Sequence, residues 1–221
     1  MSLRYSCLVL DHDDTVVDSI ATVHYPSFLE TLSRVKPDFQ PSLTEYRRLN
    51  HAHGFEALCY QVLGFSQADM QVQNEVWFSY MRRLIPPMFP GMAQLLRAFR
   101  AAGGHICVVS HSWASYIRRD YRSWGAPEPE LIYDWSLPTR FRKPSPWPLW
   151  EISRILGVAP REMLMVDDLQ PGRSMARSAG VDFAAAGWAE AVPDVRLDMQ
   201  TGGGVYCQSV AQLANLLFSG Q

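Results

Sequence analysis

The chain has 221 residues, enough for one large domain or for a domain that carries a smaller inserted one. Hydrophobic residues make up 48% of it, which is ordinary for a globular protein and excludes wholesale disorder. The 20 basic and 22 acidic residues are closely balanced, so the composition gives no sign of a surface that binds nucleic acid.

The four cysteines lie far apart, without the close pairs that metal sites and redox motifs use. We therefore expect buried free thiols in a reducing compartment. The sequence shows no leader of basic and then apolar residues, and no apolar stretch long enough to span a bilayer. These features predict a soluble, cytoplasmic protein with no membrane partner.

The segment Cys7–Leu10 is a short apolar run that leads directly into three acids, Asp11, Asp13 and Asp14. A run without polar alternation is typical of a strand that is buried on both faces. Carboxylates clustered at the end of such a strand repel one another and lose hydration, so we expect a positive group among them. Mg²⁺, which prefers oxygen ligands, is the simplest candidate. The alternative is an ordinary polar turn, because Asp is a common turn residue.

Residues 20–85 have a different character, with apolar side chains at helical spacing and no strand-like alternation. The segment Ser42–Glu45 has the capping-box pattern that marks the start of a helix. We predict that residues 20–85 form a small helical insert, and that residues 1–19 and 86–221 together form the main domain.

The rest of the chain alternates apolar runs with amphipathic helical patterns. Strands are predicted at residues 105–110, 131–134, 163–166 and 181–185, and helices at residues 92–99, 113–117, 149–156 and 210–217. This alternation indicates an α/β fold with a parallel sheet that is covered by helices on both faces. Parallel strands present their carboxyl ends at one edge of the sheet, so the polar residues that follow them can meet there.

Four motifs occur in order along the chain: Asp11-x-Asp13-x-Thr15, Ser110, Lys143 in a Lys-Pro-x-Pro sequence, and Asp167-Asp168 followed by Ala179-Gly180. With the intervening Pro90-Gly91, this ordered set resembles the haloacid dehalogenase-like hydrolase superfamily. The resemblance spans nearly the whole chain and implies a Rossmann-like α/β domain. The helical insert is similar to the cap domain of the family's phosphoglycolate phosphatase-like members.

The resemblance implies a catalytic role for five residues. Asp11 would be the nucleophile that forms an aspartyl-phosphate, and Asp13 would act first as the acid and then as the base. Lys143, the Ser110 hydroxyl and the peptide N–H of His111, at the start of a helix, would hold the phosphate. The implied protein is a phosphatase that acts on a small phosphorylated metabolite.

The same resemblance implies a Mg²⁺ site formed by Asp11, the backbone carbonyl of Asp13, Asp167 and Asp168. Here the sequence departs from the commoner family pattern. Gly172 stands where the family usually has a second acid, and Asp167 stands where it usually has glycine. Either Asp167 replaces that acid or a water molecule does.

Two further features concern the surroundings of this site. Asp14 stands where glycine is usual in the family, and its added charge can point into solvent. Substrate choice is expected to lie in the insert, where Arg47, Arg48, Asn50 and His51 form the densest polar group. For any one of these four residues, a position on a solvent-exposed helix face, without contact to substrate, is at least as good an interpretation.

Two other functions use the same parts. A sugar-phosphate mutase forms the same aspartyl-phosphate but keeps water out, and a scaffold protein could retain the fold without turnover, with Gly172 as the supporting feature. Dehalogenation is disfavoured because it needs no acid at Asp13, and phosphonate cleavage because the insert offers only Lys36. His12 is expected to line the pocket at most, and Trp77 to lie in the core.

Overall fold

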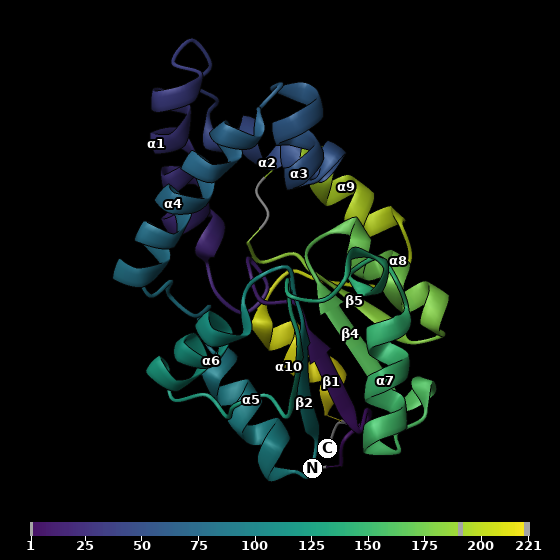
Figure 1. Ribbon diagram of the computed structural model, residues 1–221. Helices are drawn as coiled ribbons and strands as arrows, with labels where there is room; N and C mark the ends of the chain where they lie inside the picture. Colours follow the sequence, from purple (N-terminus) through teal and green to yellow (C-terminus); the bar gives the residue numbers. More distant parts are fainter. Residues whose placement is uncertain (1, 190–191, 219–221) are drawn as a thin grey trace.

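The computed structural model describes residues 2–189 and 192–218 and contains a six-stranded parallel sheet in the order β3-β2-β1-β4-β5-β6 (Figure 1). The strands are β1 (Cys7–Leu10), β2 (His105–Val109), β3 (Leu131–Tyr133), β4 (Met163–Asp167), β5 (Asp182–Ala186) and β6 (Val205–Cys207). The α/β fold with a parallel sheet is confirmed. β1 lies at the centre, paired with β2 on one side and β4 on the other.

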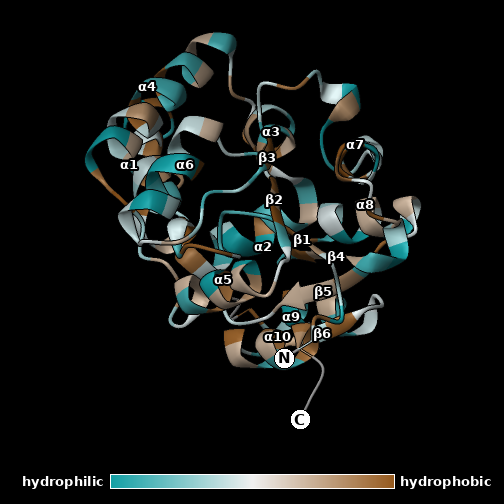
Figure 2. Cartoon of the chain, turned by 90° about the horizontal axis from the view of Figure 1, so that it is seen from below, coloured by the Kyte–Doolittle hydropathy of each residue, from teal (hydrophilic) through white to brown (hydrophobic). Residues whose placement is uncertain are grey.

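The strands are apolar on both faces because helices cover both sides of the sheet. Alternate residues of β1 point to opposite faces, with Leu8 and Leu10 in one hydrophobic cluster and Cys7 and Val9 in the other. One face packs against α5 (Met92–Ala101), α6 (Ala114–Ser123) and α10 (Val210–Leu217); the other packs against α7 (Trp147–Leu156), α8 (Gln170–Ala179) and α9 (Pro193–Thr201). Figure 2 shows the hydrophobic strands in the interior and hydrophilic residues on the outer turns of the helices.

The segment between β1 and α5 is helical and lies beyond the carboxyl ends of the strands, at the top of Figure 1. It contains η1 (Ile20–His24), α1 (Tyr25–Val35), α2 (Leu43–His53), α3 (Phe55–Ala57), η2 (Leu58–Val62) and α4 (Gln67–Arg83). Its helices bury a cluster of their own around Phe28, Leu32 and Leu58. We call residues 20–85 the helical segment. Ser42 caps α2 by accepting a hydrogen bond from the Glu45 N–H, as the sequence pattern predicts.

Several elements of the sheet domain were not predicted, among them α8, α9 and β6. β6 is a three-residue edge strand that follows Gly202-Gly203-Gly204, and it is too short to show a period. α9 has only two buried residues, Val195 and Met199, so its amphipathic pattern is weak. The four cysteines are buried and free, as expected. Within the described part of the chain, no helix has the length and apolar character needed to cross a membrane.

Candidate active site

The chain turns sharply after β1, as the spacing of Asp11 and Asp13 requires. The His12 carbonyl accepts hydrogen bonds from the N–H groups of Val16 and Val17, at 2.9 and 3.2 Å. Asp14 occupies the left-handed region with φ of 53°, a conformation in which glycine is less strained than any other residue. This explains why glycine suits position 14. The turn places the Asp11 and Asp13 side chains on one pocket.

Lys143 lies between two carboxylates at the centre of this pocket. Its Nζ donates to Asp11 Oδ1 and to Asp167 Oδ2, both at 2.7 Å, and its side chain is only 6% exposed. Although burial disfavours a charged amine, these two carboxylates raise the pKa of Lys143. The ammonium group therefore faces the two aspartates in its charged form, from the loop that precedes α7.

Three buried carboxylates form a cluster that suits a hard cation. Asp11, Asp167 and Asp168 each contribute an oxygen, and these oxygens lie within 4.8 Å of one another. Burial raises the pKa of Asp167 to about 6, even though Lys143 acts in the opposite direction. Burial and the charges of Asp167 and Asp11 also raise the pKa of Asp168. Oxygen donors that repel one another in a buried site fit Mg²⁺, because the cation offsets both their mutual repulsion and their lost hydration.

The cluster forms because the strands are in register. Leu10 of β1 pairs with Val166 of β4, so Asp11 and Asp167 follow at the same level of the sheet, and the Asp11 N–H donates to the Val166 carbonyl at 2.9 Å. Asp168 then lies at the turn into α8 and accepts a 3.4 Å hydrogen bond from Thr15. The acids from the two ends of the chain thus meet at one point.

Asp167 occupies the space that a side chain at position 172 would need. A Cβ placed on Gly172 would lie 2.1 Å from Asp167 Oδ2 and 2.5 Å from Asp167 Cβ, which is closer than atoms approach. The Asp167 carboxylate is held there by Lys143 and by the Leu169 N–H, at 2.7 and 2.8 Å. The carboxylate of Asp167 therefore occupies the space of the side chain that position 172 lacks, and the two departures from the family pattern are linked.

Ser110 and His111 line the same pocket, together with Ile20 from the helical segment. The Ser110 hydroxyl accepts a 3.1 Å hydrogen bond from the Ser112 N–H, which leaves its proton available to donate. The expectation that a helix begins at His111 is wrong, because α6 begins at Ala114. The His111 N–H therefore belongs to the loop between β2 and α6.

Asp14 does not point into solvent. It is 1% exposed, its Oδ1 accepts from the Ile20 N–H at 2.9 Å, and its Oδ2 pairs with Arg47 Nη2 of α2 at 2.8 Å. Burial raises the pKa of Asp14 to about 7, although the Arg47 charge opposes this. Arg47 Nη1 also donates to the Ala189 carbonyl at 2.6 Å. The solvent interpretation failed because the charge of Asp14 is matched by a residue 33 positions away.

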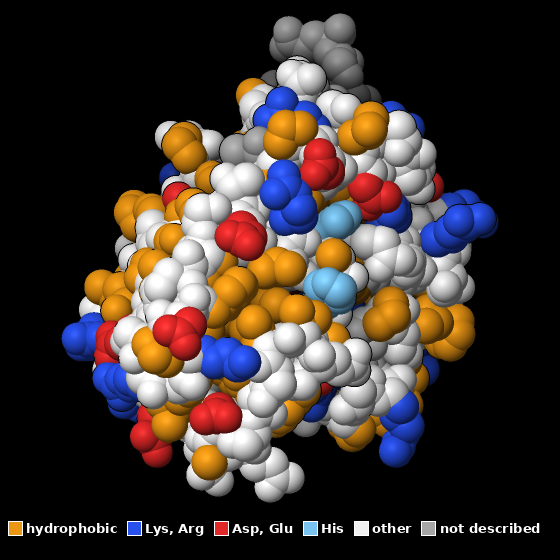
Figure 3. All heavy atoms as spheres, turned by 90° about the horizontal axis from the view of Figure 1, so that it is seen from above, with side chains coloured by type: hydrophobic (Ala, Val, Ile, Leu, Met, Phe, Trp, Pro, Cys, Tyr) orange, Lys and Arg blue, Asp and Glu red, His pale blue; other side chains and the backbone are white. Residues whose placement is uncertain are grey.

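The other polar residues of α2 also make contacts away from the pocket lining. Arg48 pairs with Asp194 at 3.0 Å and His51 with Asp198 at 3.3 Å, so both hold α2 against α9. Asn50 donates to the Tyr46 carbonyl within its own helix. Their part in substrate choice stays a prediction. Figure 3 shows the molecule from above, with acidic and basic side chains interspersed on that face.

Sequence reasoning missed two groups near Asp13. Ser19 and His24 both contact the Asp13 carboxylate, at 2.7 and 3.0 Å. His12 does not line the pocket, because it is fully buried and its Nε2 lies 3.2 Å from Asp120 of α6. In the sequence, these residues are recognisable only as polar side chains among apolar neighbours. That pattern does not show which carboxylate each of them contacts.

The sequence profile described as haloacid dehalogenase-like hydrolase matches residues 8–186. The chain therefore belongs to this family, as its ordered motifs predicted. Among curated protein sequences, none matches the chain.

Solved structures share the fold over most of the chain at low sequence identity. A HAD family hydrolase from Deinococcus radiodurans with bound phosphate and sodium is 22% identical, with a TM-score of 0.75 over 98% of this chain and 99% of that one. CbbY from Rhodobacter sphaeroides in complex with xylulose-1,5-bisphosphate is 20% identical, with a TM-score of 0.74 over 95% and 96%. A predicted phosphoglycolate phosphatase from Haemophilus somnus is 21% identical, with a TM-score of 0.68 over 82% and 85%.

Proposed function

We propose that this protein is a Mg²⁺-dependent phosphatase that hydrolyses a small phosphorylated metabolite through an aspartyl-phosphate. The observation that carries the proposal is the contact of Lys143 with Asp11 beside two further buried carboxylates, in a pocket that Asp13 and Ser110 also line. Two of the similar structures hold phosphate or a sugar bisphosphate, which supports a phosphorylated substrate. The cytoplasmic location stays a prediction.

In the proposed first step, an Asp11 oxygen attacks phosphorus, the bond to the leaving oxygen breaks, and Asp13 gives its proton to that oxygen. In the second step, water attacks the aspartyl-phosphate while Asp13 takes a proton from it, which frees Asp11 and inorganic phosphate. Lys143, the Ser110 hydroxyl and the His111 N–H would hold the phosphate oxygens. Mg²⁺ held by Asp11, Asp167, Asp168 and the Asp13 carbonyl would supply further positive charge.

The helical segment, residues 20–85, would act as a cap over this pocket, and residues 1–19 and 86–221 would form the core domain. Its Ile20 lines the pocket, and its Arg47 and Arg48 are tied to the sheet domain. A cap that excludes bulk water strengthens the electrostatic interactions inside the pocket. The segment would then also carry the contacts that choose the leaving group.

The proposal is tested with purified protein and a generic phosphate monoester. We expect hydrolysis with Mg²⁺ and none with EDTA, and a loss of at least about 10⁴-fold in kcat for Asp11→Asn, which removes the nucleophile. The matched control is Asp38→Asn, an exposed carboxylate of the helical segment, which should keep full activity. Equal rates with and without EDTA would contradict the metal site, and an active Asp11→Asn variant would contradict the nucleophile.

The same preparation separates the alternatives. A sugar monophosphate should yield free phosphate; a positional isomer instead would identify a mutase. A scaffold protein would turn over neither substrate. Asp167 argues against the scaffold interpretation, because it supplies a carboxylate to the cluster although Gly172 does not.

A further inference from the structure

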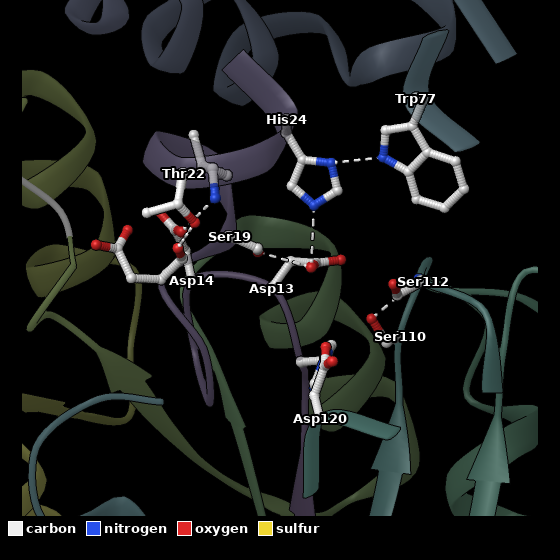
Figure 4. A network of polar contacts seen from close by, with 12 residues as sticks. Asp13, Asp14, Ser19, Thr22, His24, Trp77, Ser110, Ser112 and Asp120 are labelled. Atoms are coloured by element: carbon white, nitrogen blue, oxygen red, sulfur yellow. Dashed lines mark hydrogen bonds and ion pairs between the residues drawn. The ribbon is translucent and has the colours of Figure 1, made fainter. Parts of the chain in front are cut away.

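The Asp13 carboxylate is held asymmetrically by residues of the chain that follows it. Its Oδ1 lies 2.7 Å from the Ser19 hydroxyl, which donates to it, and 3.0 Å from Nε2 of His24 (Figure 4). Both contacts are made to the same oxygen. In Figure 4 the second oxygen of Asp13 lies on the side away from Ser19.

Trp77 fixes which nitrogen of His24 carries the proton. The indole Nε1 of Trp77 lies 2.9 Å from Nδ1 of His24 (Figure 4). An indole N–H only donates, so Nδ1 must accept, and the imidazole proton must then be on Nε2, where it points at Asp13. Burial favours the neutral ring, while the Asp13 charge raises the pKa of His24. A doubly protonated ring would lose the hydrogen bond from Trp77, so this contact favours the neutral ring.

The local structure that places His24 is unusual. Residues Ile20–His24 form a π-helical turn, in which the Tyr25 N–H bonds to the Ile20 carbonyl. A π turn holds one more residue than an α turn, and such turns are frequent at functional sites. The extra residue changes the face of the helix on which the side chains after it lie, and in this arrangement the His24 ring contacts Asp13.

Trp77 in turn is held by both parts of the molecule. Its ring lies beside that of His24 with an interplanar angle of 13°, and it meets Tyr116 of α6 edge-on at 5.9 Å. Tyr116 belongs to the sheet domain, whereas Trp77 lies on α4 of the helical segment. The hydrogen bonds to Asp13 therefore depend on how the helical segment sits on the sheet.

We propose that His24 and Trp77 are positioning residues for the proton transfer at Asp13. Ser19 and His24 keep Oδ1 as a hydrogen-bond acceptor, which leaves Oδ2 as the oxygen that can give or take the proton, and Trp77 keeps His24 in the tautomer that donates to Oδ1. The inference rests on the proposed phosphatase function. When the leaving oxygen departs from phosphorus, it takes the proton from Oδ2; the resulting carboxylate later takes a proton from the attacking water.

The leaving group distinguishes this role from simple support of the fold. An alkyl phosphate needs a proton on its departing oxygen, whereas p-nitrophenolate leaves well without one. For Trp77→Phe and His24→Leu we expect kcat on glycerol phosphate to fall about 10–100-fold, which is less than the roughly 10²–10⁴-fold that a general acid contributes, because Asp13 itself remains. On p-nitrophenyl phosphate we expect a clearly smaller loss, because there only the second step, in which Asp13 takes a proton from water, needs Asp13 in position. His24→Gln should recover most of the loss, because its amide N–H₂ can donate to Asp13.

Trp124→Phe is the matched control. Trp124 also donates its indole N–H, but to the backbone carbonyl of Pro86 and outside the contacts of Asp13. We expect this variant to hydrolyse both esters at the wild-type rate. Equal losses on the two esters for Trp77→Phe, or a loss in Trp124→Phe as large as in Trp77→Phe, would overturn the proposal.

A second measurement does not depend on turnover. In ¹⁵N-histidine-labelled protein, the His24 signals, assigned by their absence in His24→Gln, should show a neutral ring protonated at Nε2. In Trp77→Phe this preference should be lost. Wild-type His24 protonated at Nδ1 alone would overturn the inference. If neither ester is hydrolysed but the tautomer is the expected one, the proposed function fails while the hydrogen-bond relay stands.

Discussion

The sheet domain and the helical segment contribute to the same pocket by different physical means. At the sheet edge the interactions are between full charges: Lys143 lies between Asp11 and Asp167, all three nearly excluded from solvent. From the helical segment, a chain of hydrogen bonds reaches Asp13, which lines the pocket, with Trp77 acting through His24. The charged residues at the sheet edge are held in place by the register of β1 and β4. In our proposal, the helical segment orients the Asp13 carboxylate for proton transfer, so this orientation depends on how the helical segment packs on the sheet domain.

The largest effect is expected at Gly172, on the sheet-domain side of the comparison, where Asp167 leaves no space for a side chain. Gly172→Ala should destabilise the protein by about 3 kcal/mol, the upper range for overpacking a buried site, and lower kcat at least tenfold by displacing Asp167. The measurements are chemical denaturation and initial rates. Ser178→Ala, an exposed position on the same helix, is the control and should change neither.

Because Asp167 fills the space beside Gly172, a second substitution at position 167 should restore activity to a variant with an acid at position 172. If Asp167 and the family's usual acid are interchangeable, the double variant Asp167→Gly/Gly172→Asp should be at least tenfold more active than Gly172→Asp alone. A double variant as inactive as the single one would show that Asp167 does more than fill the position of that acid.

The helical segment contacts the sheet domain through both buried and exposed ion pairs. Arg47 and Arg48, which are adjacent on α2, provide one of each kind. Arg47→Met leaves the buried Asp14 without its partner and should cost about 3 kcal/mol of unfolding free energy. Arg48→Met removes an ion pair whose side chains are 50% and 70% exposed, so it should cost less than about 1 kcal/mol. Denaturation curves measure both. Equal costs would contradict the distinction between the buried and the exposed tie.

The smallest effect is a dependence of stability on pH. Burial raises the pKa of Asp14 to about 7 and that of Asp167 to about 6, so the folded protein binds protons that the unfolded chain has already released. Without metal, stability should therefore fall as pH rises from about 4 to about 7. We expect a Tm lower by about 5 °C at pH 8 than at pH 5.5 in EDTA.

Mg²⁺ should reverse this trend, because it replaces the protons on the clustered carboxylates. Thermal melts at the two pH values, with EDTA and with Mg²⁺, check both statements. The stabilisation by Mg²⁺ should be larger at pH 8. A Tm in EDTA that rises with pH over this range would contradict the assignment of buried, repelling carboxylates.

Much of the sheet-edge geometry could be predicted from the sequence because each residue directly follows a buried strand. Asp11 follows β1 and Asp167 ends β4, and parallel pairing alone brings them to one level. Lys143 was found because it lies in a motif of the family. Its position between two carboxylates depends on the path of the loop before α7, and no periodicity gives that path.

The helical segment was predicted as helix, but its contacts were not. The helical period shows which residues share a face, yet it does not show how that face is rotated toward the sheet. The π turn at Ile20–His24 breaks the period by one residue, so a regular helix would have turned His24 elsewhere. Asp14 was misjudged for the related reason that its partner, Arg47, comes from this segment.

The tight approach of Asp167 to Gly172 restricts how this sequence can drift over evolutionary time. A lineage cannot gain an acid at 172 first, because that side chain and the one at 167 exclude each other. Losing Asp167 first would remove one of the two partners of Lys143. Descendants should therefore keep or abandon both residues together, and covariation of these two alignment columns among future homologues would be the trace of that constraint.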